Sequence, residues 1–137
     1  MRNERNVTRA TITFGLRTFG AAPLPVHVDL EYDTLDPYAV ATTYHTGAGS
    51  VRWMFGRDLL ADGLLAPTGE GDVRVSPAAG LSMVVFELEA PDGAAVLEAP
   101  AHELAAFLDS TYDLVLAGQE TSWFDFDHEM EKLAFNY

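Results

Sequence analysis

The strongest constraint in this chain is a period-two alternation of apolar and polar residues across most of its first 56 positions. It is clearest where Val26, Val28, Leu30 and Tyr32 alternate with polar residues. Because successive side chains of a strand point to opposite faces, the alternation predicts half-buried strands. The same pattern predicts further strands over residues 10–17, 38–45 and 51–55.

The rest of the chain mixes strands with helices. Residues 57–62 predict a short helix that Gly63 stops, and Pro100 suits the first turn of a longer helix. Residues 112–122 are expected to form a loop. A last helix is expected after the loop, with Phe126, Met130, Leu133 and Tyr137 on one side. Three more strands are predicted over residues 73–75, 81–90 and 94–98, the first ended by Pro77.

These elements predict an α+β fold. We expect a mostly antiparallel, strongly twisted sheet, or sheets, of about seven strands, with one short inserted helix and two C-terminal helices. At 137 residues, of which 48% are hydrophobic, the chain is expected to form a single domain over residues 1–137. It contains no cysteine, which excludes disulfides and thiolate metal sites. We see neither a secretory signal nor a run of residues suited to membrane insertion.

The charge is strongly negative and unevenly distributed. The net charge is −13, and residues 75–137 hold one base, Lys132, against 12 acids. Nucleic-acid affinity comes largely from Lys and Arg displacing counterions, so direct binding to nucleic acid is not expected. One interpretation of the acidic charge is that it keeps the protein soluble. A more specific interpretation is that it forms a surface for a basic partner protein or peptide.

The ionisable residues form no recognisable catalytic motif. His27, His45 and His102 lie on polar strand faces or in a helical first turn, and Asp127-His128-Glu129 lacks the second histidine of a zinc helix. A metal site built from Asp125, His128 and a distant carboxylate stays open, although a surface role is favoured. We therefore expect no enzyme activity and no cofactor, and a binding or assembly role.

An aromatic and acidic cluster near the C-terminus is the candidate protein-interaction site. It consists of Trp123, Phe124, Asp125, Phe126 and Asp127. Three large apolar side chains within four residues cannot all lie on one helical stripe, so at least one is expected to face another subunit or protein. This cluster favours a homo-oligomer.

A family resemblance is carried by four runs of residues. They are Y-D-T-L-D-P-Y-A-V over 32–40, R-D-L-L-A-D-G-L over 57–64, P-T-G-E-G-D-V-R-V over 67–75 and L-E-A-P over 97–100. Their order resembles that of the SsgA-like proteins of sporulating actinomycetes over about residues 26–110. The ending F-D-F-D-H-E-M over 124–130 is similar to that of the SsgB branch of this family.

The resemblance implies a cytoplasmic, non-enzymatic regulator of septation and sporulation. Such a protein would assemble as a trimer, mark septum sites and recruit the tubulin-like division protein FtsZ with an SsgA-type companion. The family fold is similar to that of the whirly proteins, which bind single-stranded nucleic acid. One alternative is therefore a single-stranded nucleic-acid binder that uses Tyr32, Tyr44 or Trp53 for stacking. Another is a small hydrolase or lyase that uses His45 or His128.

Overall fold

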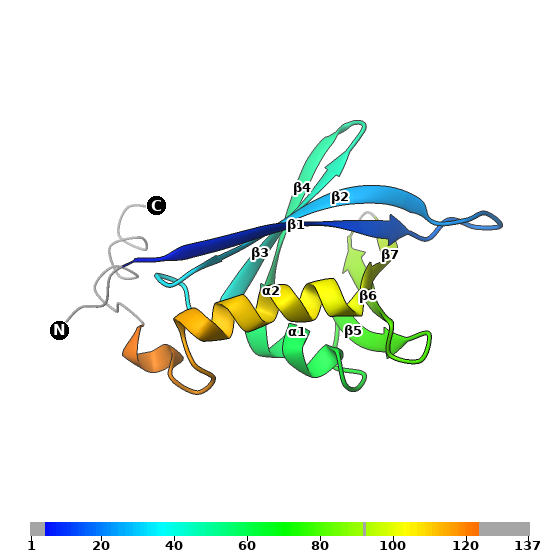
Figure 1. Ribbon diagram of the computed structural model, residues 1–137. Helices are drawn as coiled ribbons and strands as arrows, with labels where there is room; N and C mark the ends of the chain where they lie inside the picture. Colours follow the sequence, from blue (N-terminus) through cyan, green and yellow to red (C-terminus); the bar gives the residue numbers. More distant parts are fainter. Residues whose placement is uncertain (1–4, 92, 124–137) are drawn as a thin grey trace.

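A computed structural model describes residues 5–91 and 93–123 of the 137-residue chain. It contains one antiparallel sheet of seven strands in the order β4-β3-β2-β1-β7-β6-β5, with two α-helices beneath it (Figure 1). The strands are β1 (Val7–Leu16), β2 (Leu24–Asp33), β3 (Ala39–Thr46), β4 (Gly49–Gly56), β5 (Val73–Ala78), β6 (Met83–Ala90) and β7 (Gly93–Pro100). The helices are α1 (Arg57–Gly63), α2 (Ala101–Leu114) and a short 3₁₀ turn, η1 (Glu120–Ser122).

The sheet consists of two meanders joined at a narrow seam. Strands β1–β4 form one meander and β5–β7 the other, each with neighbouring strands paired in chain order. In the described residues, the seam between β1 and β7 has two registered pairs, Gly15–Glu98 and Leu16–Leu97, and the amide of Arg17 donates to the carbonyl of Val96 at 2.9 Å just beyond them. Within each meander the paired strands are therefore neighbours in the sequence, whereas the seam joins strands that are far apart in the sequence.

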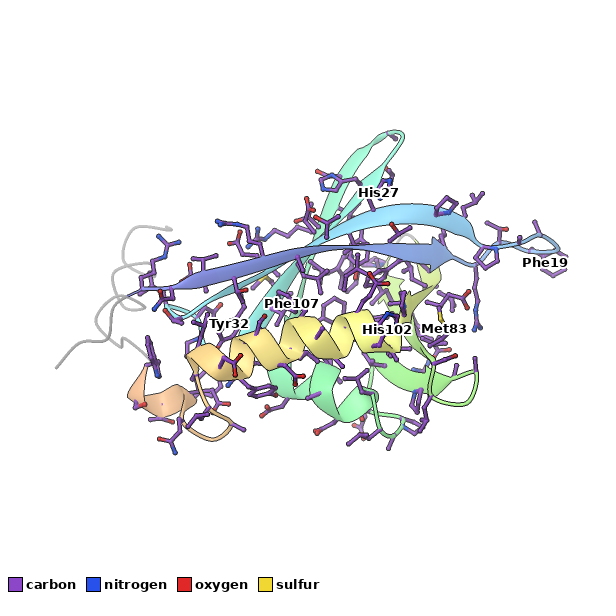
Figure 2. All side chains as sticks on the ribbon, in the orientation of Figure 1. Phe19, His27, Tyr32, Met83, His102 and Phe107 are labelled. Carbon is purple, nitrogen blue, oxygen red and sulfur yellow. The ribbon has the colours of Figure 1, made fainter. Side chains whose placement is uncertain are left out.

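The core lies between the inner face of the sheet and the helices. Phe14 packs against Tyr44 and Phe86, with ring centroids 5.9 and 5.2 Å apart, and Phe86 contacts Phe55 at 5.6 Å. Helix α2 packs against β1 and β7, and α1 packs against β4 and β5. Figure 2 shows Phe107 between α2 and the sheet. The predicted alternation is confirmed, because Val26, Val28, Leu30 and Tyr32 are all buried.

Three local expectations differ from the structure. Helix α2 continues to Leu114, into the segment that was expected to be a loop, and η1 occupies part of the remainder. Pro100 is the residue before the first turn of α2 rather than a member of it. Strand β5 runs through Pro77 to Ala78, which an edge strand allows because it has a side without a ladder partner. The second expected C-terminal helix lies outside the described residues.

Gly63 is required by packing rather than by the turn that ends α1. A Cβ atom at this position would lie 2.7 Å from Val75 Cβ, so α1 approaches β5 more closely than any side chain allows. The loop after α1 does use glycine conformation, since Gly69 and Gly71 have φ values of 100° and 74°. The P-T-G-E-G run over residues 67–71 is therefore a tight loop.

Candidate protein-interaction site

A buried arginine organises the structure beside the predicted site. Arg57 follows β4 as the first residue of α1 and is 1% exposed. Its Nη1 donates to the carbonyl oxygens of Thr111 at 3.1 Å and Val115 at 2.7 Å, which are carbonyls at the end of α2. Its Nη2 donates to Glu120 Oε1 at 2.8 Å. One guanidinium group therefore joins the start of α1, the end of α2 and η1.

The surroundings of Arg57 favour its charge and that of its partner. The guanidinium lies over the rings of Tyr112 and Tyr32, 4.1 and 5.0 Å from their centroids. The hydrogen bond from Arg57 lowers the pKa of Glu120 below its usual value. Burial raises the pKa of both tyrosines to about 12, so their hydroxyls stay neutral. We call Arg57, Glu120, Tyr32 and Tyr112 the arginine cluster.

The arginine cluster fixes the position of Trp123. The backbone amide of Trp123 donates to the carbonyl of Glu120 at 3.0 Å, and its side chain packs half-buried against the core. Nearby, the hydroxyls of Tyr38 and Thr121 are hydrogen-bonded at 2.9 Å. Trp123 is thus held by the fold. The other four predicted site residues, Phe124, Asp125, Phe126 and Asp127, lie outside the described residues.

The outer face of β1–β4 is a polar surface with a shallow depression of about 550 Å³. Arg9 pairs with Glu31 at 2.9 Å, and His45 Nε2 contacts Asp29 Oδ2 at 2.7 Å. Thr11 donates to the same carboxylate at 2.7 Å, which together with His45 lowers the pKa of Asp29. These exposed pairs lie along neighbouring strands. The polar residues of the alternating sequence pattern therefore form ion pairs and hydrogen bonds across neighbouring strands on the outer face.

The histidines do not converge on a reaction centre. His27 is the cross-strand neighbour of His45 and contacts Thr13, while His102 is exposed in the first turn of α2 (Figure 2). Within residues 5–91 and 93–123, no group of three or more histidine, aspartate or glutamate side chains is arranged to hold a metal ion. His128 and Asp125 lie outside these ranges. In the described residues, the arrangement offers binding surfaces.

The inner face carries an apolar groove that sequence reasoning did not identify. The groove has a volume of about 180 Å³, and an adjoining hollow of about 250 Å³ shares Trp53, Leu88 and Ala95 with it. Of the three aromatic residues considered for stacking on nucleic acid, Tyr32 and Tyr44 are buried in the core. Tyr44 also lines the groove, and Trp53 is half-buried in its wall.

These features define a small α+β protein with a curled seven-stranded sheet, a polar depression on its outer face and an apolar groove on its inner face. No helix in the described part of the chain has the length and apolar character needed to cross a membrane. Residues 26–120 match the model of the family described as Streptomyces sporulation and cell division protein, SsgA. The chain belongs to this family, which confirms the resemblance seen in its motifs.

The sequence relatives are named for one branch of the family. The chain is 50% identical over 135 residues to the sporulation-specific cell division protein SsgB of Saccharopolyspora erythraea, covering 97% of this chain and 96% of that protein. It is 51% identical over 113 residues to SsgB of Streptomyces coelicolor, covering 80% and 82%. A role in sporulation-associated cell division follows from these matches.

Solved structures show the same fold. One, from work that correlates SsgB mutations with longitudinal cell division during sporulation of Streptomyces coelicolor, has a TM-score of 0.84 and 43% identity, covering 90% of this chain and all of that one. An SsgA-like sporulation-specific cell division protein from Thermobifida fusca has a TM-score of 0.84 and 36% identity, covering 97% and 99%. The predicted α+β class and seven-stranded sheet are therefore confirmed.

Proposed function

We propose that this protein is a non-catalytic adaptor of cell division that works in the cytoplasm at the division septum. It marks septum sites and recruits or stabilises FtsZ together with an SsgA-type companion. The observation that carries this proposal is the match along 97% of the chain to a sporulation-specific cell division protein. The binding surfaces of the curled sheet agree with a role based on adhesion.

Self-association is part of the proposed mechanism. The 137 residues act as one domain, and copies of it assemble, with a trimer as the favoured state. An assembly presents several identical surfaces to a polymer, so weak individual contacts combine into firm attachment. The strongly acidic second half of the chain, with 12 acids and one base over residues 75–137, suits basic patches on the partner.

The proposed partner contact is the segment Trp123, Phe124, Asp125, Phe126 and Asp127. Its first residue is half-buried against the core and follows the arginine cluster directly. The segment therefore begins at a residue that the fold holds in place, and its aromatic and acidic side chains would supply both apolar and charged contacts. The Arg57–Glu120 pair would then act as a positioning element for binding.

Co-sedimentation with polymerising FtsZ tests the proposal. The wild-type chain is expected to enter the pellet with the polymer, and the variant Phe124→Ser/Asp125→Asn/Asp127→Asn is expected to stay largely in the supernatant. Glu87→Gln/Glu89→Gln on β6 is the matched control, because it removes the same number of acids and both of its positions are exposed. Equal pelleting of all three chains would refute the assigned contact. Failure of the wild type to pellet would refute the recruitment of FtsZ.

A further inference from the structure

Strand β4 forms one edge of the sheet, and half of its backbone groups face away from β3. The amide of Arg57, directly after β4, donates to the carbonyl of Tyr38, directly before β3, at 2.8 Å. Residues along an antiparallel strand alternate between facing the partner strand and facing away from it. The amides and carbonyls of Ser50, Arg52 and Met54 therefore face outward, where the described part of the chain offers them no hydrogen-bond partner.

The opposite edge of the sheet, β5, is protected. The loop after α1 forms an isolated bridge with its middle, because the amide of Thr68 donates to Val75 at 2.8 Å and accepts from it, through its carbonyl, at 2.9 Å. Pro77 removes a further amide donor from the same strand. Proteins protect exposed edges in such ways, because an open edge is a template for another strand. Residues 49–56 of β4 contain no proline, and Figure 1 shows the β3–β4 hairpin extending beyond the other strands.

Arg52, in the middle of this open edge, has no ion pair in the described part of the chain. The other five arginines described there each contact a carboxylate within 3.6 Å. Arg52 is exposed, and its neighbours on the same face are the uncharged Thr43 opposite and Ser50 and Met54 along β4. No strand lies on its other side.

The carboxylates closest to Arg52 on the outer face lie on the inward side of β4. Those of Asp29, Glu31, Asp33 and Asp36 line the two hollows that Arg52 also lines, and they belong to β2 or to the turn after it. The first three already contact a basic side chain at 2.7 to 2.9 Å. The space beyond the edge is therefore where a carboxylate can meet Arg52 at close range.

Both faces of the edge also expose apolar side chains. Met54, on the outer face with Arg52, is 47% exposed, and Val51, on the inner face, is 50% exposed. Trp53 lies on the same face as Val51 and is half-buried. A strand that pairs with β4 would cover both faces, because its side chains alternate between them as those of β4 do.

We propose that β4 binds an extended segment of a partner protein as an added antiparallel strand, with an acidic residue opposite Arg52. Apolar residues of that segment lie opposite Met54, Trp53 and Val51, so the segment reads apolar, apolar, acidic, apolar. In such strand addition the backbone bonds give affinity and the alternate side chains give specificity. The inference goes beyond the proposed function and uses a surface separate from residues 123–127.

A second copy of β4 leaves the charge of Arg52 unmatched. Residues that face outward must meet residues that face outward, so two antiparallel registers pair nearly the whole strand with itself. One register is centred on Arg52 and places the two arginines opposite each other. The other is centred on Trp53 and places Arg52 opposite Met54. Neither register supplies a carboxylate, whereas an acidic segment of another protein does.

Amide hydrogen exchange followed by NMR tests the strand addition. In the free chain, the amides of Arg52 and Met54 are expected to exchange much faster than those of Val51 and Trp53, which bond to β3. An excess of the capped peptide S-I-V-E-V-S is expected to slow exchange at Arg52 and Met54. Slow exchange there in the free chain would mean that the edge is already closed, for example by a second copy, and would overturn the proposal. No slowing with the peptide would overturn it as well.

A charge exchange tests the acidic residue opposite Arg52. In 0.15 M salt, which screens the net charge of −13 beyond about 8 Å, the peptide S-I-V-K-V-S is expected to bind wild type about threefold to tenfold more weakly than S-I-V-E-V-S. Arg52→Glu is expected to reverse this order. Arg74→Glu, at an exposed arginine of the protected edge, is expected to keep the wild-type order. Equal affinity of wild type for both peptides would overturn the assigned partner chemistry, while co-sedimentation with FtsZ measures recruitment independently.

Discussion

At one end of the inner face of the sheet, helices cover the apolar side chains, and at the other end no helix of the described residues covers them. The same alternation of apolar and polar residues along the strands produces the apolar side chains at both ends. On β4, Phe55 is 2% exposed next to α1, whereas Val51, four residues earlier on the same face, is 50% exposed at the groove. On β2, exposure falls from 54% at Leu24 to 8% at Val26, and Tyr32 is fully buried. Helices and the arginine cluster cover one end, and the groove lies at the other.

This difference shows that alternation fixes which side of a strand is apolar but not what covers that side. Burial requires a second layer, and that layer is α1 and α2 at one end. At the other end the second layer is absent from the described residues, and the apolar stripe becomes a groove. A core and a groove can thus be two stretches of one sequence pattern.

The largest expected effect comes from removing the arginine at the covered end. Arg57→Met is expected to lower the free energy of unfolding by about 3–5 kcal/mol, because it leaves the Glu120 carboxylate buried and without its partner. Urea unfolding at pH 7 measures the change. Arg74→Met is the control, since its pairs with Glu87 and Glu89 are exposed and contribute at most about 1 kcal/mol. Equal losses would mean that the cluster does not stabilise the covered end.

Two alanine variants on β4 compare the two ends directly. Phe55→Ala is expected to cost about 3–5 kcal/mol, because it opens a cavity between the sheet and the helices. Val51→Ala is expected to change the free energy of unfolding of dissociated chains by about 0.5 kcal/mol or less. Thermal and urea unfolding at low protein concentration measure both variants. A large loss in Val51→Ala would show that the groove end is already closed within one chain.

Acidification should weaken the covered end through Glu120. Its pKa in the folded chain lies below the usual 4.5, so its stabilising contribution is full above pH 4.5 and disappears as the pH falls through the folded-state value. Glu120→Gln is expected to be about 1.5–3 kcal/mol less stable than wild type at pH 7. The gap should narrow below pH 4.5. Urea unfolding from pH 7 to pH 3 measures it, with exposed Glu103→Gln as the control. If the difference in stability between wild type and Glu120→Gln stayed constant with pH, the stabilising role assigned to the Glu120 carboxylate would be contradicted.

The smallest expected effect lies in the turn between β5 and β6, away from both ends. Leu81 has a φ of 73° in the left-handed region, which is costly for a residue with a side chain, and it is exposed. Leu81→Gly is therefore expected to raise the free energy of unfolding by about 0.5 kcal/mol, because relief of the left-handed strain is partly offset by the greater entropy of glycine in the unfolded chain. Leu65→Gly, at an exposed leucine without a positive φ, is expected to produce no gain. A stabilising Leu65→Gly would contradict the backbone explanation.

The seven strands and α1 could be predicted from local pattern, because alternation and turn residues act over a few positions. The end of α2 could not be predicted, since its last carbonyls are capped by Arg57, which is 54 residues from Thr111 and 58 from Val115 in sequence. Glu120 looked like one acid among many until the fold placed it against the same guanidinium, 63 residues away. Contacts between residues so far apart in the chain leave no periodic pattern in the sequence, so they could not be predicted from it.

The candidate site was predictable only in part. Trp123 was identified from the density of aromatic residues, and the structure places it beside the arginine cluster. The assignment of Phe124, Asp125, Phe126 and Asp127 stays a prediction. The groove was missed because its residues come from six strands that are far apart in the sequence.

The narrow seam between β1 and β7 has a consequence for the shape of the whole protein. In the described residues, two registered pairs and the Arg17–Val96 backbone hydrogen bond cross it, so this ladder constrains the bend between the meanders less than the longer ladders constrain the strands within each meander. Helix α2, which contacts both β1 and β7, works as the brace that sets this bend. A change in the size of the buried side chains of α2 would therefore alter the angle between the two meanders, with no change in the strands themselves.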